Sequence, residues 1–127
     1  MSKGRKASEA RREILSITSH YAGVVRTEEG LKKGLKALEA LKRERIACDE
    51  KGLAFALETE NMLDVAEMVL RACLMRKESR GPHLFFAHFD DPFPLPIQDT
   101  KWRRYIVLQN QAGKIALKKK IPVKLEV

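Results

Sequence analysis

The chain changes character at Gly81-Pro82, and this change constrains its fold more than any other feature. Before it, apolar residues recur at the spacing of three and four that is typical of amphipathic helices. After it, prolines stand at positions 82, 92, 94 and 96, and each fixes φ and removes a backbone donor. With 127 residues, the chain is about one domain. We therefore expect a three-helix bundle over residues 1–81, followed in the same domain by a proline-rich arm and a C-terminal β-hairpin over residues 82–127.

Three segments before Gly81 are predicted to be helices. The first carries an apolar stripe and ends at Gly23, which we expect to adopt a left-handed stop; its stripe is Ile14, Leu15, Ile17 and Tyr21. The second begins at the N-cap Thr27, runs to about residue 46, and includes Gly30 and Gly34, which permit close packing of a neighbouring helix. The third covers residues 53–77. The fold class is therefore mainly α.

The third predicted helix is apolar over an unusually wide surface. One stripe holds Phe55, Met62, Val65, Ala66, Val69 and Cys73, and a neighbouring one holds Leu63, Leu70 and Leu74. Two interpretations are open. Part of this helix meets another domain or subunit, or the whole surface is a broad core-facing stripe.

The segment beyond the arm has the alternation of a β-hairpin. Residues 102–108 predict a strand, and residues 109–113 predict a turn, with Asn110 and Gly113 suited to left-handed conformations. A second strand follows from Ile115, and Ile121, Val123, Leu125 and Val127 continue its period of two.

Charge is distributed unevenly along the chain. The formal net charge is +8, with +4 in residues 1–12, +7 in residues 101–127 and −3 between them. No aromatic residues alternate with the basic ones to stack against bases, so we do not expect nucleic-acid binding. A free-standing basic adaptor that binds acidic protein or nucleic acid through the two ends remains the alternative function.

Residue types that carry catalysis are not arranged into a recognisable motif. The seven glycines never come within two residues of one another, which excludes a GxGxxG dinucleotide loop and a phosphate-binding P-loop. No HExxH or CxxC is present, and Cys48 and Cys73 are expected to be reduced. The sequence therefore predicts no catalytic, metal or cofactor-binding residue in this chain. No apolar run is long enough to span a bilayer, no signal peptide is evident, and we expect a cytoplasmic protein without direct membrane insertion.

Three separated motifs carry a resemblance to a known family. They are YAGVVRTEEGL at residues 21–31, ENMLDVAEMV at residues 60–69 and RKESRGPH at residues 76–83. In this order they resemble the C-terminal region of the succinate dehydrogenase and fumarate reductase flavoprotein subunits, a region that L-aspartate oxidase shares. The charged run alone would be typical of an ordinary helix end, but the three motifs together are far more specific.

The resemblance implies a position in an assembly rather than an activity of this chain. It implies a spectrin-repeat-like three-helix bundle that docks on an FAD-binding domain or subunit, with an iron–sulfur subunit as a further candidate partner. The parent enzyme would be an FAD-dependent oxidoreductase, whose flavin and catalytic residues lie outside this chain. The candidate docking residues are Glu78, Ser79, Arg80, His83, Asp99 and Trp102.

One departure from the family pattern lies just after the charged run. Phe85 stands where the family usually has an Arg two residues after the motif histidine, whereas Asp99 and Trp102 keep the Asp-x-x-Trp spacing. We therefore expect the arm to dock through apolar groups.

Overall fold

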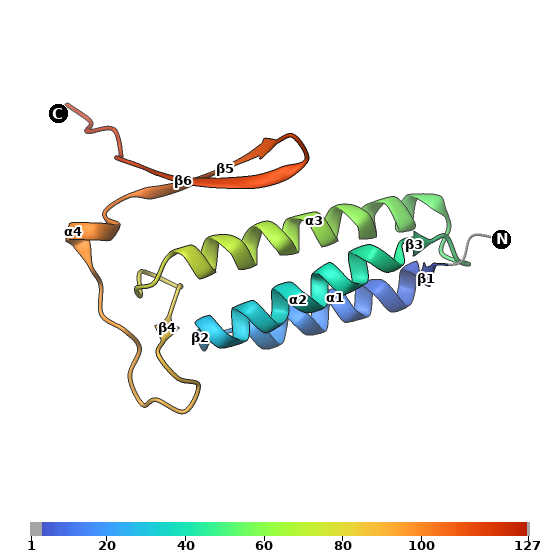
Figure 1. Cartoon of the computed structure of the whole chain (residues 1–127), viewed down its shortest axis with the longest axis horizontal. Coiled ribbons are helices and arrows are strands. Elements are labelled where there is room, and N and C mark those ends of the chain that lie inside the picture. Colours follow the sequence, from blue (N-terminus) through green and yellow to red (C-terminus); the bar gives the residue numbers. More distant parts are fainter. Residues whose placement is uncertain (1–3, 127) are drawn as a thin grey trace.

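The computed structural model describes residues 4–126 as three long helices lying side by side, with a hairpin over one of them (Figure 1). The helices are α1 (Ala7–Tyr21), α2 (Glu28–Glu44) and α3 (Leu53–Met75). A short helix, α4 (Asp99–Trp102), precedes strands β5 (Tyr105–Gln111) and β6 (Lys114–Lys120), and β5 lies against α3. The prediction of helices followed by a C-terminal antiparallel hairpin is confirmed, and the chain also has small two-stranded sheets. None of the described helices combines the length and apolar character that crossing a bilayer requires.

Two short parallel strand pairs hold opposite ends of the three helices. At one end, β1 (Arg5–Lys6) pairs with β3 (Ile46–Ala47), and at the other, β2 (Arg26–Thr27) pairs with β4 (Phe85–Phe86) (Figure 1). The Arg5 amide donates to the Arg45 carbonyl at 2.9 Å, and the Arg26 amide donates to the Leu84 carbonyl at 3.2 Å. The pairing of β2 with β4 places the segment after α3 against the helices.

The start of α2 follows the sequence prediction, and the end of α1 does not. Thr27 caps α2 because its Oγ1 accepts a hydrogen bond from the Gly30 amide at 3.0 Å. Gly23 was predicted as a left-handed stop, but this is wrong: α1 ends at Tyr21, and Gly23 has no positive φ. Glycine is needed there for a different reason, since a Cβ would lie 2.5 Å from the Ser19 carbonyl oxygen.

The core uses residues from both predicted stripes of α3. The buried residues of α3 recur at offsets of three and four and are Ala56, Thr59, Leu63, Ala66, Leu70 and Cys73. Leu63 and Leu70, from the second predicted stripe, are core residues, whereas Val65 and Val69 are exposed. The small side chains of Ala66 and Ala10 are both buried in the same core. The wide apolar surface of α3 is therefore only partly covered within this chain.

The segment between α3 and the hairpin contributes to the core. Phe85 is buried in the same cluster as Leu31 and Leu70, and Leu95 packs against that cluster. Residues 87–98 form turns and irregular backbone without a helix or strand. Phe85 thus fills an apolar site within the chain.

The strands of the hairpin differ from their predicted bounds. The predicted turn over residues 109–113 is too long, because residues 109–111 belong to β5 and pair with residues 114–116. Strand β5 begins at Tyr105 because residues up to Trp102 belong to α4. The turn has Ala112 at φ 52° and Gly113 at φ 82°, and the Gly113 amide donates to Asn110 Oδ1 at 2.9 Å. The predicted continuation of the strand is wrong for residues 121–126, which follow β6 without strand pairing; Val127 lies outside the described residues. Pro122 removes one of the donors that such pairing would need.

We predict that Gly34→Ala lowers the free energy of unfolding by about 1 kcal/mol. The added Cβ would lie 2.6 Å from Leu70 Cδ2 and 3.1 Å from Tyr21 Cβ, and the resulting overpacking outweighs the better helix propensity of alanine. Urea unfolding of both proteins measures the change. Lys36→Ala, at an exposed position of α2, is the control and should change stability by less than about 0.5 kcal/mol. A gain in stability for Gly34→Ala would show that α1 and α3 do not pack tightly against this position.

Candidate docking site

The buried carboxylate of Glu78 is the centre of a polar cluster beyond the end of α3. Its side chain is 0% exposed. Oε1 accepts from Arg76 Nη1 at 2.8 Å and from Arg80 Nε at 2.8 Å, and Oε2 accepts from the Gln98 amide at 2.7 Å. Two cations and one backbone donor therefore satisfy a single buried anion, which is the condition under which burying a charge is tolerated.

These contacts determine the ionisation of Glu78. Burial by itself would raise the pKa of this carboxyl group, but hydrogen bonds from Arg80, the Gln98 amide and Arg76 outweigh it and lower the pKa to about 2. Glu78 is therefore charged at neutral and mildly acidic pH. The cluster is an ion network under these conditions.

The two arginines extend the network to α4 and the start of the hairpin. Arg80 Nη2 donates to Asp99 Oδ1 at 2.7 Å, at the first residue of α4. Arg76 donates to the Trp102 carbonyl at 3.1 Å and to the Arg104 carbonyl at 2.6 Å. The backbone after α4 is thus attached directly to the end of α3.

Trp102 lies between two cations in this region. Its side chain is buried, with the Arg76 guanidinium carbon 5.0 Å and Lys119 Nζ 3.7 Å from the ring centroid. Because Lys119 belongs to β6, the indole connects α4 with the second strand of the hairpin. Trp102 therefore has a packing role within this chain.

His83 lies between Arg76 and Arg26 and is held in its neutral form. Its Nε2 lies 2.8 Å from the Arg76 carbonyl and its Nδ1 lies 3.0 Å from Arg26 Nη1, so Nε2 carries the proton and Nδ1 accepts. Burial lowers the pKa of His83, and the Arg26 charge lowers it further. A neutral histidine fixed between a carbonyl and an arginine is poorly placed for proton transfer to a substrate.

Ser79 and Gly81 shape the turn that returns the chain to the helices. Ser79 Oγ accepts from the Phe85 amide at 3.0 Å. Gly81 has φ 56°, which favours glycine, and the Arg80 amide donates to the His83 carbonyl at 2.8 Å. The turn thereby directs Phe85 into the core.

The structure brings all six predicted docking residues into one neighbourhood. They are Glu78, Ser79, Arg80, His83, Asp99 and Trp102, and each makes contacts within the chain. Their docking role remains a prediction. The contribution of Arg26 was not predicted, because its partner His83 lies far along the chain. The bonds from Arg76 to the carbonyls of Trp102 and Arg104 were not predicted either, for the same reason.

An apolar groove lies between α1 and α3 on the helical surface. Leu15, Val65 and Val69 are 51%, 53% and 43% exposed and line a hollow of about 550 Å³. Polar groups lie along it, including Arg11, Glu58 and Asn61. Three branched apolar side chains exposed together are typical of a surface that is covered by a partner.

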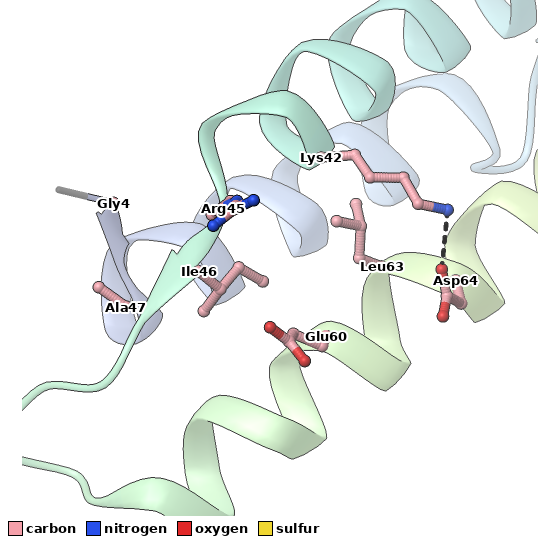
Figure 2. Close-up of a pocket in the computed structure, with 8 residues that line it drawn as sticks. All are labelled: Gly4, Lys42, Arg45, Ile46, Ala47, Glu60, Leu63 and Asp64. Atoms are coloured by element: carbon pink, nitrogen blue, oxygen red, sulfur yellow. Dashed lines mark hydrogen bonds and ion pairs between the residues drawn. The ribbon is translucent and has the colours of Figure 1, made fainter. Parts of the chain in front are cut away.

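A second hollow, of about 620 Å³, lies where α2 and β3 meet α3 (Figure 2). Its Lys42 is occupied by ion pairs to Asp64 at 2.9 Å and Glu67 at 3.1 Å. Leu63 and Ile46 form part of its lining, and no histidine, cysteine or hydroxyl group is among the lining residues. This hollow therefore offers no arrangement for catalysis. Among residues 4–126, no group of three or more histidine, cysteine or acidic side chains could hold a metal ion.

Comparison with known proteins gives a single family. The model described as "Fumarate reductase flavoprotein C-term" matches residues 11–127. An uncharacterised FAD-dependent oxidoreductase of Methanocaldococcus jannaschii is 33% identical over 104 residues, which are 78% of this chain and 18% of that protein. The L-aspartate oxidase of Streptomyces coelicolor is 34% identical over 107 residues, which are 80% of this chain and 17% of that protein. The chain thus spans less than a fifth of these relatives.

Solved structures share the fold over nearly the whole chain. The E. coli quinol fumarate reductase matches with a TM-score of 0.74 at 20% identity, over 98% of this chain and 23% of the other. The adenylylsulfate reductase of Archaeoglobus fulgidus matches with a TM-score of 0.80 at 23% identity, over 96% of this chain and 20% of the other. At these identities the likeness shows the fold alone. The relatives named here are oxidoreductases, and they give no support to a free-standing basic adaptor.

The glycines of this chain are not arranged in the dinucleotide-binding fingerprint. Binding FAD through the dinucleotide fingerprint requires glycines clustered between a strand and a helix, where the backbone approaches the pyrophosphate. Here Gly30 and Gly34 lie inside α2, and Gly34 is occupied by contacts with Tyr21 and Leu70. The other glycines are separated from one another along the chain, so within residues 4–126 they do not form this glycine-rich loop.

We predict that Glu78→Gln lowers the free energy of unfolding by about 3 kcal/mol at neutral pH, because it leaves the charges of Arg76 and Arg80 without their buried anion. The pKa of Glu78 in the folded protein is about 2, below its ordinary value of 4.5. The stabilisation is therefore complete above about pH 4.5 and is lost as the pH falls toward 2.

Urea unfolding across this pH range measures the effect. The stability difference between the parent chain and Glu78→Gln should shrink steadily below pH 4.5. Glu60→Gln, at an exposed position of α3, is the matched control and should change stability little at any pH. A difference for Glu78→Gln that stays constant with pH would contradict the assigned ion network.

Proposed function

The chain belongs to the fumarate reductase flavoprotein C-terminal family, and we propose that it is the C-terminal helical domain or subunit of an FAD-dependent oxidoreductase of the succinate dehydrogenase and fumarate reductase type. Its role there is structural: it docks on the FAD-binding part of the enzyme. Because the chain covers less than a fifth of its relatives, the dehydrogenation or reduction of a dicarboxylate or of aspartate belongs to the rest of the assembly.

The observation that carries this proposal is the apolar groove between α1 and α3. Leu15, Val65 and Val69 are aliphatic, and covering such side chains contributes about 25 cal/mol for each Å² removed from water. None of the residues that line the groove belongs to the ion network beyond the end of α3. It is therefore a ready-formed surface for a rigid neighbour, and we assign the FAD-binding domain or subunit to it.

The segment after Gly81 supplies a second apolar contact to the same neighbour. Phe93 is 80% exposed, and Phe89 is also exposed. Both lie in the irregular stretch whose ends are fixed by β4 and by the ion network. We propose that residues 82–127 form the arm of the same domain as residues 1–81, whose helices are a spectrin-repeat-like three-helix bundle.

In this arrangement, the six candidate docking residues act at the junction. Glu78, Ser79 and His83 are buried and hold the arm in place, whereas Arg80 and Asp99 keep part of their surface exposed. The exposed pair is available to polar groups of the FAD-binding part, and Trp102 supports α4 behind it. An iron–sulfur subunit is a further candidate partner of the assembly.

We predict that the double variant Val65→Ser/Val69→Ser weakens association with the FAD-binding part of the parent enzyme roughly 30-fold, or about 2 kcal/mol, because apolar area in the groove is lost. Titration calorimetry with the two parts as separate polypeptides measures the affinity. The matched control is Leu53→Ser/Leu57→Ser, an exposed apolar pair at the start of α3. Equal affinity of the groove variant and the parent chain would refute docking through this groove.

A simpler measurement tests the assignment of the cofactor. We predict that the purified chain, mixed with FAD and passed through a desalting column, retains no visible flavin absorption, because its glycines do not form a phosphate-binding loop. Stoichiometric retention of flavin would show that this chain carries a cofactor site of its own.

A further inference from the structure

The hairpin carries a row of lysines on one of its two faces, and the side chain at one end of this row, Lys114, lies at the edge of a hollow against α3. Side chains alternate between the two faces of a strand, so residues two apart along β6 point to the same face. Lys114, Lys118 and Lys120 therefore share one face of the hairpin. Their partners on β5 are Gln111, Val107 and Tyr105. The other face carries Leu108 and Ile115, which line a hollow against α3 together with Met68.

Positive charge on the lysine-bearing face is not compensated within the chain. The helices neutralise many of their cations, as in the pairs of Lys42 with Asp64, Arg71 with Glu67 and Lys77 with Glu28. Among residues 4–126, no ion pair joins Lys114, Lys118 or Lys120 to a carboxylate. No acidic residue occurs between Asp99 and Glu126.

Two of these lysines are close enough for their positive charges to repel each other. Lys118 and Lys120 are two residues apart on one strand, so their Cα atoms are roughly 7 Å apart, within the screening length of about 8 Å at physiological salt. An anion bound at this face would reduce their mutual repulsion. Lys119, on the opposite face, is different, because its ammonium lies over the Trp102 ring.

We propose that the lysine-bearing face of the hairpin, made of Tyr105, Val107, Gln109, Gln111, Lys114, Ala116, Lys118 and Lys120, is a second docking surface that binds an acidic protein surface. The cations recognise carboxylates. Between them, the amides of Gln109 and Gln111 and the half-buried Val107 and Ala116 suit protein side chains and backbone.

Two other anionic partners fit this face less well. A nucleic acid would require several aromatic side chains for base stacking, and this face has only Tyr105. An anionic membrane would favour a large apolar surface beside the cations, and the apolar side chains between these lysines are small and half-buried. The surface lies on a different element from the α1/α3 groove, so this proposal does not depend on the docking proposed above.

The test compares affinities of the full chain for poly-L-glutamate, used as the acidic polypeptide probe, by titration calorimetry at low and moderate salt. The triple variant Lys114→Gln/Lys118→Gln/Lys120→Gln should bind about tenfold more weakly than the parent chain. The control Arg12→Gln/Lys36→Gln/Lys51→Gln removes the same charge from exposed positions elsewhere and should lose less than twofold. Circular dichroism verifies that both variants are folded.

Three outcomes would overturn the proposal. Equal losses in the two triple variants would show that only net charge matters. Tighter binding of a single-stranded DNA oligonucleotide than of poly-L-glutamate, abolished by the hairpin variant, would assign the face to nucleic acid. Preferential binding to phosphatidylglycerol vesicles, abolished by the same variant, would assign it to a membrane surface.

Discussion

The arrangement of everything after α3 depends on one buried anion. Glu78 accepts from Arg76, Arg80 and the Gln98 amide, and the two arginines continue to Asp99 and to the carbonyls of Trp102 and Arg104. Without the carboxylate, two guanidinium groups would be left facing each other in a region that excludes water. The ion pairs of Glu78 therefore fix the path of the segment between α3 and the hairpin, which has almost no regular secondary structure of its own.

Local signals in the sequence predicted the elements that depend on local physics. Thr27 was identified as the cap of α2 because a hydroxyl before two acidic residues is a helix start, and Gly113 was identified in the hairpin turn because it tolerates positive φ. The order of the three helices and the hairpin follows from such signals. Residues 121–126 show where such local signals fail. Their alternating pattern predicted a strand, but a strand also needs a neighbouring strand to pair with.

The face of α3 that is buried could not be read from hydrophobicity. Both stripes are apolar, and the choice depends on how closely the helices approach each other. Gly34 and Ala10 allow close contact, which selects Leu63 and Leu70 for the core and leaves Val65 and Val69 outside. The candidate docking residues were found through their motif. The contacts that these residues make within the chain were not predicted, because partners such as Arg26 and His83 are distant from each other in sequence.

The pairing of β2 with β4 has a consequence for how the chain folds. It joins the connection between the first two helices to a segment beyond the third, so a large part of the chain must be ordered before these few hydrogen bonds can form. The helix contacts are mostly between helices that are neighbours in sequence, so we expect them to form early and the pairing of β2 with β4 to form late. On this expectation Phe85 enters the core after the helices have packed, and the return of the chain after α3 limits the last step of folding.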